Sequence, residues 1–185
     1  MVKIRPRTKD DIDGCIALLD HIQRTEGYPQ GIGDLRLFLN SDDINQAWVA
    51  SDGATNDIVG HISTYNPTKD LAIELWKKLY PQNTESITVL SRLFVLPSYR
   101  KEGIAAKLVE AVVSWSIEQG IRLLLWVVVA NEAAIRLYDR LGWIRFGTTV
   151  YTYEDGQTME AICFASPVPN NIANTHARDR SKLSC

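Results

Sequence analysis

The sequence contains few of the side chains that bind metals or form disulfides. Among its 185 residues there are 3 cysteines and 3 histidines. Cys15, Cys163 and Cys185 are scattered widely along the chain, and no histidine completes a zinc-binding spacing with them. An odd, scattered set of cysteines is typical of reduced thiols rather than of a disulfide framework. We therefore expect an intracellular, cytoplasmic protein that holds no metal.

The sequence also lacks an excess of positive charge and a long apolar run. It has 20 Lys and Arg against 22 Asp and Glu, a formal net charge of −2. A chain without a positive excess has no overall field that would attract nucleic acid or an anionic membrane surface. The longest apolar run, Leu123 to Ala130, is far shorter than the roughly 20 residues that cross a bilayer. These absences predict a protein that binds neither nucleic acid nor membranes.

The composition is that of one folded domain with a polar end. Hydrophobic residues make up 45% of the chain and charged residues 23%, which is ordinary for a globular protein, and the length suits a single domain. From Pro167 onward the chain is polar and has no apolar periodicity, as is typical of disorder. We expect a domain over residues 1–166 and a disordered tail over residues 167–185.

Hydrophobic spacing alternates along the chain between the period of a strand and the period of a helix. Pro81 and Gly120 mark two of the element ends. The spacing predicts strands over 2–5, 47–50, 58–65, 87–96, 121–130, 143–153 and 158–164, and helices over 12–22, 34–39, 68–80, 103–119 and 132–141. This order predicts an α/β fold with a mixed central sheet of about seven strands flanked by helices, including an extra helix between the third and fourth strands.

The segment from Leu93 to Ala105 runs from the end of a strand into the start of a helix. The first amides of a helix lack intrahelical partners and carry the positive end of the helix dipole, so they can hold a pyrophosphate. Gly103 and Ala105 would let the phosphate oxygens approach these amides closely. A short glycine motif is also compatible with an ordinary helix start, so two interpretations of this segment remain at this point.

Two motifs resemble the GNAT superfamily of N-acetyltransferases. Arg100, Gly103 and Ala105 stand in the order of its coenzyme A signature, in which Arg or Gln, two residues, Gly, one residue, then Gly or Ala follow the fourth strand. The segment from Ala130 to Trp143 is similar to the second signature of that superfamily, at the end of the fifth strand. The element order of the whole domain is also similar to that of the family.

The resemblance implies that the chain binds acetyl-coenzyme A and moves its acetyl group to a primary amine by direct attack in a ternary complex. It implies a sheet that is splayed between the fourth and fifth strands to admit the pantetheine arm. Fourth-strand amides, at Phe94 and Val95, would bind the coenzyme and polarise the acetyl carbonyl. The residues expected to bind the coenzyme are Phe94, Val95, Arg100, Lys101, Glu102, Gly103, Ile104, Ala105 and Asn131. Glycine is common in the family where Lys101 and Glu102 stand, and Glu102 puts an acidic side chain near the phosphates.

Tyr138 is the predicted catalytic residue. It stands where the family has a tyrosine whose hydroxyl points to the thioester sulfur, so it would protonate the departing thiolate. Periodicity alone also allows a core aromatic here, because Leu137 and Leu141 lie on the same helical stripe. Asn131 likewise could bond the pantetheine amide, as the matching family position does, or cap the helix that it precedes.

The general base and the acceptor remain open at this stage. Candidates for the base are His61, Ser91, Glu74 and Glu85, and a water relay is equally compatible with the sequence. The acceptor we expect is a small-molecule amine. The alternatives are a protein or peptide N-acetyltransferase acting on an α-amine or lysine, and a non-catalytic domain that senses acyl-coenzyme A. The chain is compatible with a homodimer.

Overall fold

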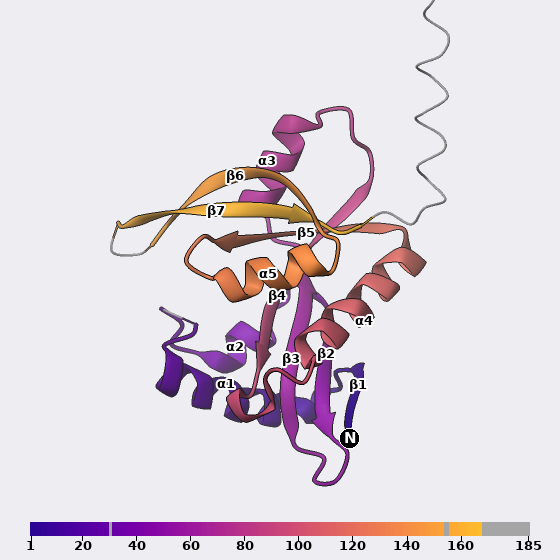
Figure 1. Ribbon diagram of the computed structural model, residues 1–185, viewed down its shortest axis with the longest axis vertical. Coiled ribbons are helices and arrows are strands. Elements are labelled where there is room, and N and C mark those ends of the chain that lie inside the picture. The colour runs from indigo at the N-terminus through magenta and orange to yellow at the C-terminus, as the bar shows by residue number, and fades with distance from the viewer. Residues whose placement is uncertain (30, 154–155, 168–185) are drawn as a thin grey trace, which may run out of the picture.

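The computed structural model describes residues 1–29, 31–153 and 156–167, so all of the expected tail except Pro167 lies outside the described residues. One central sheet is flanked by helices (Figure 1). The strands are β1 (Val2–Pro6), β2 (Ile44–Asp52), β3 (Ile58–Tyr65), β4 (Ser86–Val95), β5 (Ile121–Val128), β6 (Ile144–Thr152) and β7 (Thr158–Ala165). The helices are α1 (Ile12–Glu26), α2 (Leu35–Leu39), α3 (Leu71–Leu79), α4 (Ile104–Gln119) and α5 (Glu132–Arg140), with short 3-10 turns η1 (Lys9–Asp11) and η2 (Pro97–Tyr99).

The sheet is mixed, as the sequence predicts. Its 7 strands follow the order β1-β2-β3-β4-β5-β7-β6. Only β4 and β5 are paired in parallel among the described strands, and all other neighbours are antiparallel. The parallel pair is joined by α4, which is the crossover helix that a parallel pair requires. The expected extra helix is α3, between β3 and β4.

The sheet splits between β4 and β5. The two strands pair only from Ser86 to Val89 on β4, opposite Ile121 to Leu124 on β5. The remainder of β4, from Leu90 to Val95, pairs with β3 but with no other described strand. Beyond Leu124, β5 pairs with β7 instead. Figure 1 shows β5, β6 and β7 running across the direction of β3 and β4, so the predicted splay is present.

Helices cover both faces of the sheet. Trp48 and Ala50 of β2 pack with the buried face of α4, whereas Val49 between them packs with α1 and α2. This alternation follows from the two-residue period of a strand. A third cluster joins Trp76 of α3 to β5 and β7. The sheet is therefore buried on both sides around the split.

The described residues contain neither a membrane-spanning helix nor a cluster of metal-binding side chains. No helix in the part of the chain that the structure describes combines the length and apolar character needed to span a bilayer. No three His, Cys, Asp or Glu side chains of those residues are grouped as a metal ion would require. Cys15 and Cys163 are buried and form no disulfide.

Candidate active site

The turn from β4 into α4 has the geometry of an anion-binding helix start. Gly103 is the residue before the helix and has φ +78°, a left-handed conformation that favours glycine. The first helical hydrogen bond runs from Lys107 N to Gly103 O at 3.0 Å, so the amides of Ile104 and Ala105 have no intrahelical acceptor. No side chain caps the helix, and a Cβ built on Gly103 would meet no atom within 4 Å. The predicted phosphate-binding amides are therefore together and accessible.

Arg100 braces this turn through its side chain. Its Nε donates to Val95 O at 3.0 Å, and its two Nη atoms donate to the carboxylate of Glu26, at the end of α1, at 2.7 and 2.8 Å. The side chains of Lys101 and Glu102 are exposed beside it. Contact of these three side chains with the coenzyme stays a prediction.

Beyond Leu90, alternate amides of β4 face opposite edges of the strand. Leu96 N donates to Val59 O of β3 at 2.8 Å. Because alternate residues of an antiparallel strand point their amides to the same side, the amide of Phe94 also faces β3. The amides of Leu93 and Val95 then face the split, where β4 has no strand partner among the described residues. Of the two predicted amides, Val95 is placed to bind a ligand in the split, and Leu93 is a further donor that the sequence analysis missed.

Tyr138 combines a packed ring with a free hydroxyl. The side chain is 4% exposed, and its ring contacts those of Trp143 and Phe164 at centroid distances of 5.2 and 5.8 Å. The hydroxyl makes no hydrogen bond with any described residue. Burial, and then the nearby Tyr28, raise the pKa of Tyr138 above its usual range. The ring therefore belongs to the core, as periodicity predicted, while the hydroxyl remains available to a ligand.

The loop after α1 brings Tyr28 to the same region. Gln23 holds this loop, because its Nε2 donates to Pro29 O at 3.0 Å and to Ile32 O at 2.9 Å. Tyr28 is 40% exposed as a residue, and burial raises the pKa of its hydroxyl. Its hydroxyl interacts electrostatically with both Tyr138 and Arg92. No motif around Tyr28 in the sequence marks it as a neighbour of Tyr138.

His61 is not placed to act as a general base. It is fully buried, and its ring stacks on Phe94 at a centroid distance of 5.0 Å. Its Nε2 lies 3.1 Å from Arg7 Nη1, which can only donate, and its Nδ1 lies 3.0 Å from the Arg92 carbonyl oxygen, which can only accept. Both ring nitrogens are thus engaged, and burial lowers the pKa of His61 to about 3. The imidazole therefore links β3 to Arg7, which follows β1, and to Arg92 of β4.

The other candidate bases lie at three different places. Glu85 precedes β4 and binds Arg122 at 3.0 Å, at the end where β4 and β5 are paired and therefore away from the split. Glu74 is exposed on α3. Ser91 is half-buried on the part of β4 that has separated from β5. Of these three, only Ser91 is beside the split.

Asn131 is confirmed as the cap of α5. Its Oδ1 accepts a hydrogen bond from Ala134 N at 3.2 Å, which satisfies one of the free amides of the first turn. Its amide nitrogen donates to no described residue, so binding of pantetheine by that nitrogen stays a prediction.

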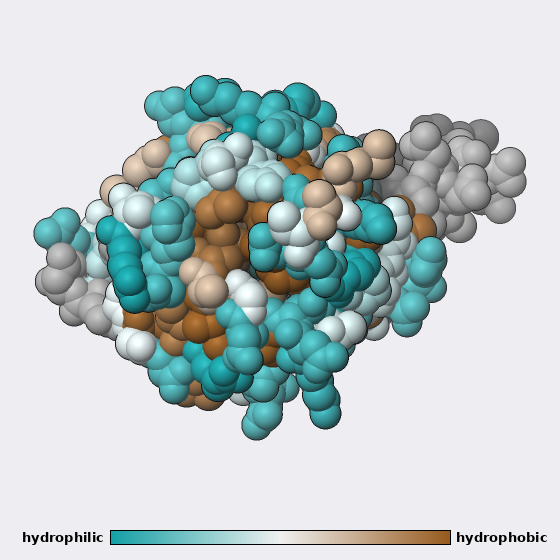
Figure 2. All heavy atoms as spheres, turned by 90° about the horizontal axis from the view of Figure 1, so that it is seen from below, coloured by the Kyte–Doolittle hydropathy of each residue, from teal (hydrophilic) through white to brown (hydrophobic). Residues whose placement is uncertain are grey.

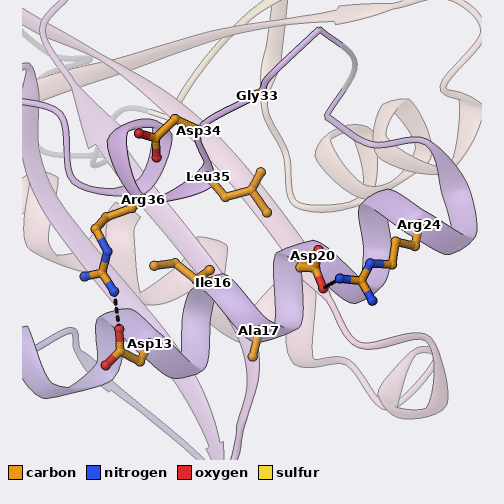
Figure 3. Close-up of a pocket in the computed structure, with 9 residues that line it drawn as sticks. All are labelled: Asp13, Ile16, Ala17, Asp20, Arg24, Gly33, Asp34, Leu35 and Arg36. Atoms are coloured by element: carbon orange, nitrogen blue, oxygen red, sulfur yellow. Dashed lines mark hydrogen bonds and ion pairs between the residues drawn. The ribbon is translucent and has the colours of Figure 1, made fainter.

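The surface is hollowed on the face seen from below in Figure 2, with hydrophobic atoms inside and hydrophilic atoms around the rim. A groove of about 600 Å³ lies between α1 and α2 (Figure 3). There Arg36 pairs with Asp13 at 2.5 Å and Arg24 with Asp20 at 2.8 Å, so both arginines of this groove are paired within the chain. None of the predicted site residues lines this groove.

Comparisons with known proteins agree with this geometry. The model of the acetyltransferase (GNAT) family matches residues 16–143. The crystal structure of Arabidopsis thaliana NAA60 in complex with a bisubstrate analogue is 24% identical, covers 91% of this chain and 100% of its own, and superposes with a TM-score of 0.68. The ribosomal-protein-S18-alanine N-acetyltransferase from Escherichia coli is 20% identical over 92% of this chain and 98% of its own, with a TM-score of 0.63. A search of curated proteins by sequence finds no match.

Proposed function

Because this chain belongs to the acetyltransferase (GNAT) family, we propose that it binds acetyl-coenzyme A and transfers the acetyl group to a primary amine. One observation carries this proposal: the split between β4 and β5 opens beside a helix start whose amides are free. A structure of Arabidopsis thaliana NAA60 that contains acetyl-CoA shares the fold, with a TM-score of 0.66 at 23% identity over 89% of this chain and 97% of its own.

The residues present fit the coenzyme. The amides of Gly103, Ile104 and Ala105 would hold the pyrophosphate, since no side chain occupies the space above Gly103. The amides of Leu93 and Val95 would hold the pantetheine arm and the acetyl carbonyl, because they face the split. The amide nitrogen of Asn131 is a further donor at the end of β5.

The reaction needs charge stabilisation and proton transfer. As the amine nitrogen bonds to the carbonyl carbon, the carbonyl oxygen gains negative charge, which the Val95 amide stabilises by hydrogen bonding. The carbon–sulfur bond then breaks, and the Tyr138 hydroxyl gives its proton to the departing sulfur. His61 cannot take the proton of the amine because both of its nitrogens are engaged, and Glu85 lies at the other end of β4. Water, reached directly or through Ser91 beside the split, would accept the amine proton and return a proton to the Tyr138 oxygen.

We propose a small-molecule acceptor. The support is the loop after α1, which Gln23 holds and whose Tyr28 interacts electrostatically with Tyr138. A loop held there would narrow the acceptor side of the split. A protein acceptor is the second candidate, and the likeness to the enzyme from Escherichia coli that acetylates an alanine of ribosomal protein S18 favours it. A pure sensor of acyl-coenzyme A would have no use for a free hydroxyl at Tyr138.

The test is a screen with purified protein and acetyl-coenzyme A against small amines and peptides, measuring release of free thiol. Mass spectrometry of the acetylated product and a reaction without amine exclude hydrolysis of the thioester. Turnover of small amines is the expected result. Turnover of peptide amino termini alone would establish the second candidate. A rise in melting temperature with acetyl-coenzyme A but no turnover of any amine would indicate a sensor.

A further inference from the structure

Arg92 occupies a bulge in β4, on the part of the strand that has left β5. Between His61 and Ser63 of β3, the paired positions on β4 move from Phe94 to Ser91, so β4 holds one extra residue there. Arg92 has φ +56°, which is uncommon for a residue other than glycine. The guanidinium carbon lies 4.8 Å from the ring centre of Phe38, on α2, and 4.9 Å from that of Tyr65, at the end of β3.

The charge of Arg92 is only weakly compensated. The residue is 8% exposed, and its Nε and Nη1 atoms are buried without a hydrogen-bond acceptor among the described residues. Its Nη2 lies 3.4 Å from Ser41 Oγ and 3.9 Å from Asp43 Oδ1, and Asp43 also accepts a hydrogen bond from Ser41. A buried guanidinium whose donors are unpaired is costly, so buried charges are usually found with partners.

A second arginine adds to this positive charge. Arg7 is partly buried, donates to Leu39 O at 2.6 Å and to His61 Nε2 at 3.1 Å, and forms no ion pair within the described ranges. His61 also bonds the Arg92 carbonyl oxygen, so one imidazole joins the two arginine residues. Burial and the charge of Arg92 lower the pKa of Arg7. The region therefore holds two cations and a single, partly exposed carboxylate at ion-pair distance, Asp43.

This charge lies beside the residues assigned to the reaction. Arg92 precedes Val95 by three positions on the same strand, so their Cα atoms are at most roughly 10 Å apart at about 3.3 Å per residue. The Tyr28 hydroxyl interacts electrostatically with Arg92 and also with Tyr138. An acceptor bound between Tyr28 and Tyr138 would therefore lie near the positive charge of Arg92.

We propose that Arg92 binds a carboxylate of the acceptor, so that the substrates are small amines that also carry a carboxylate, as amino acids do. This inference rests on the proposed function and adds its substrate class. Guanidinium and carboxylate form strong charge-assisted hydrogen bonds, and the neighbouring rings of Phe38 and Tyr65 strengthen them by excluding water. The amino terminus of a protein fits poorly, because its α-carboxyl group is consumed in the peptide bond.

The experiment compares two acceptors that differ only in whether they carry a carboxylate or a carboxamide. Thiol release gives kcat/KM for an amino acid and for its α-carboxamide, with α-, β- and γ-amino acids tried in turn. The wild type should prefer the acid by about 10- to 100-fold, the value of hydrogen bonds to a charged group. Arg92→Gln should bring the ratio close to one by raising KM for the acid, and Arg92→Lys should retain part of the preference. Arg24→Gln, at an exposed arginine of α1, should leave the ratio unchanged.

The ratio of kcat/KM for the acid to kcat/KM for the amide is insensitive to partial misfolding, because both acceptors are measured on the same protein preparation. Equal kcat/KM for acid and amide in the wild type would overturn the proposal. So would an Arg92→Gln protein that loses activity equally on both, which would show that Arg92 only supports the bulge. Preference for peptide amino termini would also refute binding of an acceptor carboxylate by Arg92, but it would leave the proposed acetyl transfer intact. Absence of thiol release with every amine would remove the proposed function and this inference together.

Discussion

Replacing Tyr138 by phenylalanine separates the two roles that its position allows. The ring contacts with Trp143 and Phe164 are retained in the variant. The hydroxyl bonds no described residue, so its removal leaves no partner unsatisfied. We therefore expect the free energy of unfolding to change by less than about 1 kcal/mol. The affinity for acetyl-coenzyme A should also change little, because the amides that would bind it are on β4 and α4.

Turnover should respond strongly to the same substitution. A general acid typically contributes a factor of about 10² to 10⁴, so kcat should fall at least about 100-fold while KM stays nearly constant. Burial raises the pKa of Tyr138, which keeps the hydroxyl protonated in the wild type throughout the neutral and mildly alkaline range. The loss should shrink above about pH 8.5, near the pKa of a free thiol, because the thiolate then departs without needing a proton.

The assay is steady-state thiol release from about pH 6.5 to about pH 9.5, together with urea unfolding of each variant. Tyr80→Phe, at a tyrosine that is 44% exposed on the end of α3, is the matched control and should keep full activity. A Tyr138→Phe protein as stable and as active as the wild type at every pH would refute the assignment. An unfolded variant would instead give the hydroxyl a structural role.

Two further predictions concern stability. His61 has its pKa lowered to about 3 in the folded chain, against about 6.5 when unfolded, so below about pH 6.5 the unfolded chain binds a proton that the folded chain excludes. The contribution of His61 to the free energy of unfolding is therefore complete above about pH 6.5 and is lost as the pH falls below it. From pH 7 to pH 5 the wild type should lose about 2 kcal/mol more than His61→Gln in urea unfolding, and equal losses would contradict this. Asp11 accepts hydrogen bonds from both Nη atoms of Arg5 at 2.7 Å and from Thr8, which lowers its pKa. Asp11→Asn should therefore cost about 1.5 to 3 kcal/mol by thermal unfolding, whereas Asp13→Asn, at an exposed ion pair, should cost less than about 1 kcal/mol, and similar costs would remove the special role of Asp11.

The order of elements could be predicted because it depends on local periodicity. Every expected strand and helix is present, with boundaries that shift by a few residues. The predicted helix over 68–80 begins at Leu71 because the Asp70 side chain accepts from Ala72 N at 2.8 Å and fixes the start. The predicted strand over 121–130 ends at Val128, where the chain turns toward Asn131 and α5.

The acceptor side could not be predicted in the same way. The bulge at Arg92 depends on a positive φ at a residue other than glycine, for which the sequence has no marker. The engagement of His61 requires contacts with Arg7 and Arg92, which are 54 and 31 positions away. The uncapped start of α4 was predictable because Gly103 and the following helix are adjacent in sequence. Features made by neighbours in sequence were therefore predictable, and features made across the fold were not.

Calorimetric titration with acetyl-coenzyme A tests the central claim most directly. The wild type should bind one equivalent, and Gly103→Ala should weaken binding by about tenfold, because its methyl group would stand between the free amides and the pyrophosphate. Gly120→Ala is the matched control, since Gly120 ends the same helix with a similar φ of +66° and equally open surroundings. Both variants carry the same backbone strain, but only Gly103→Ala should lose affinity. A wild type that binds no acetyl-coenzyme A, or equal losses in the two variants, would contradict the account.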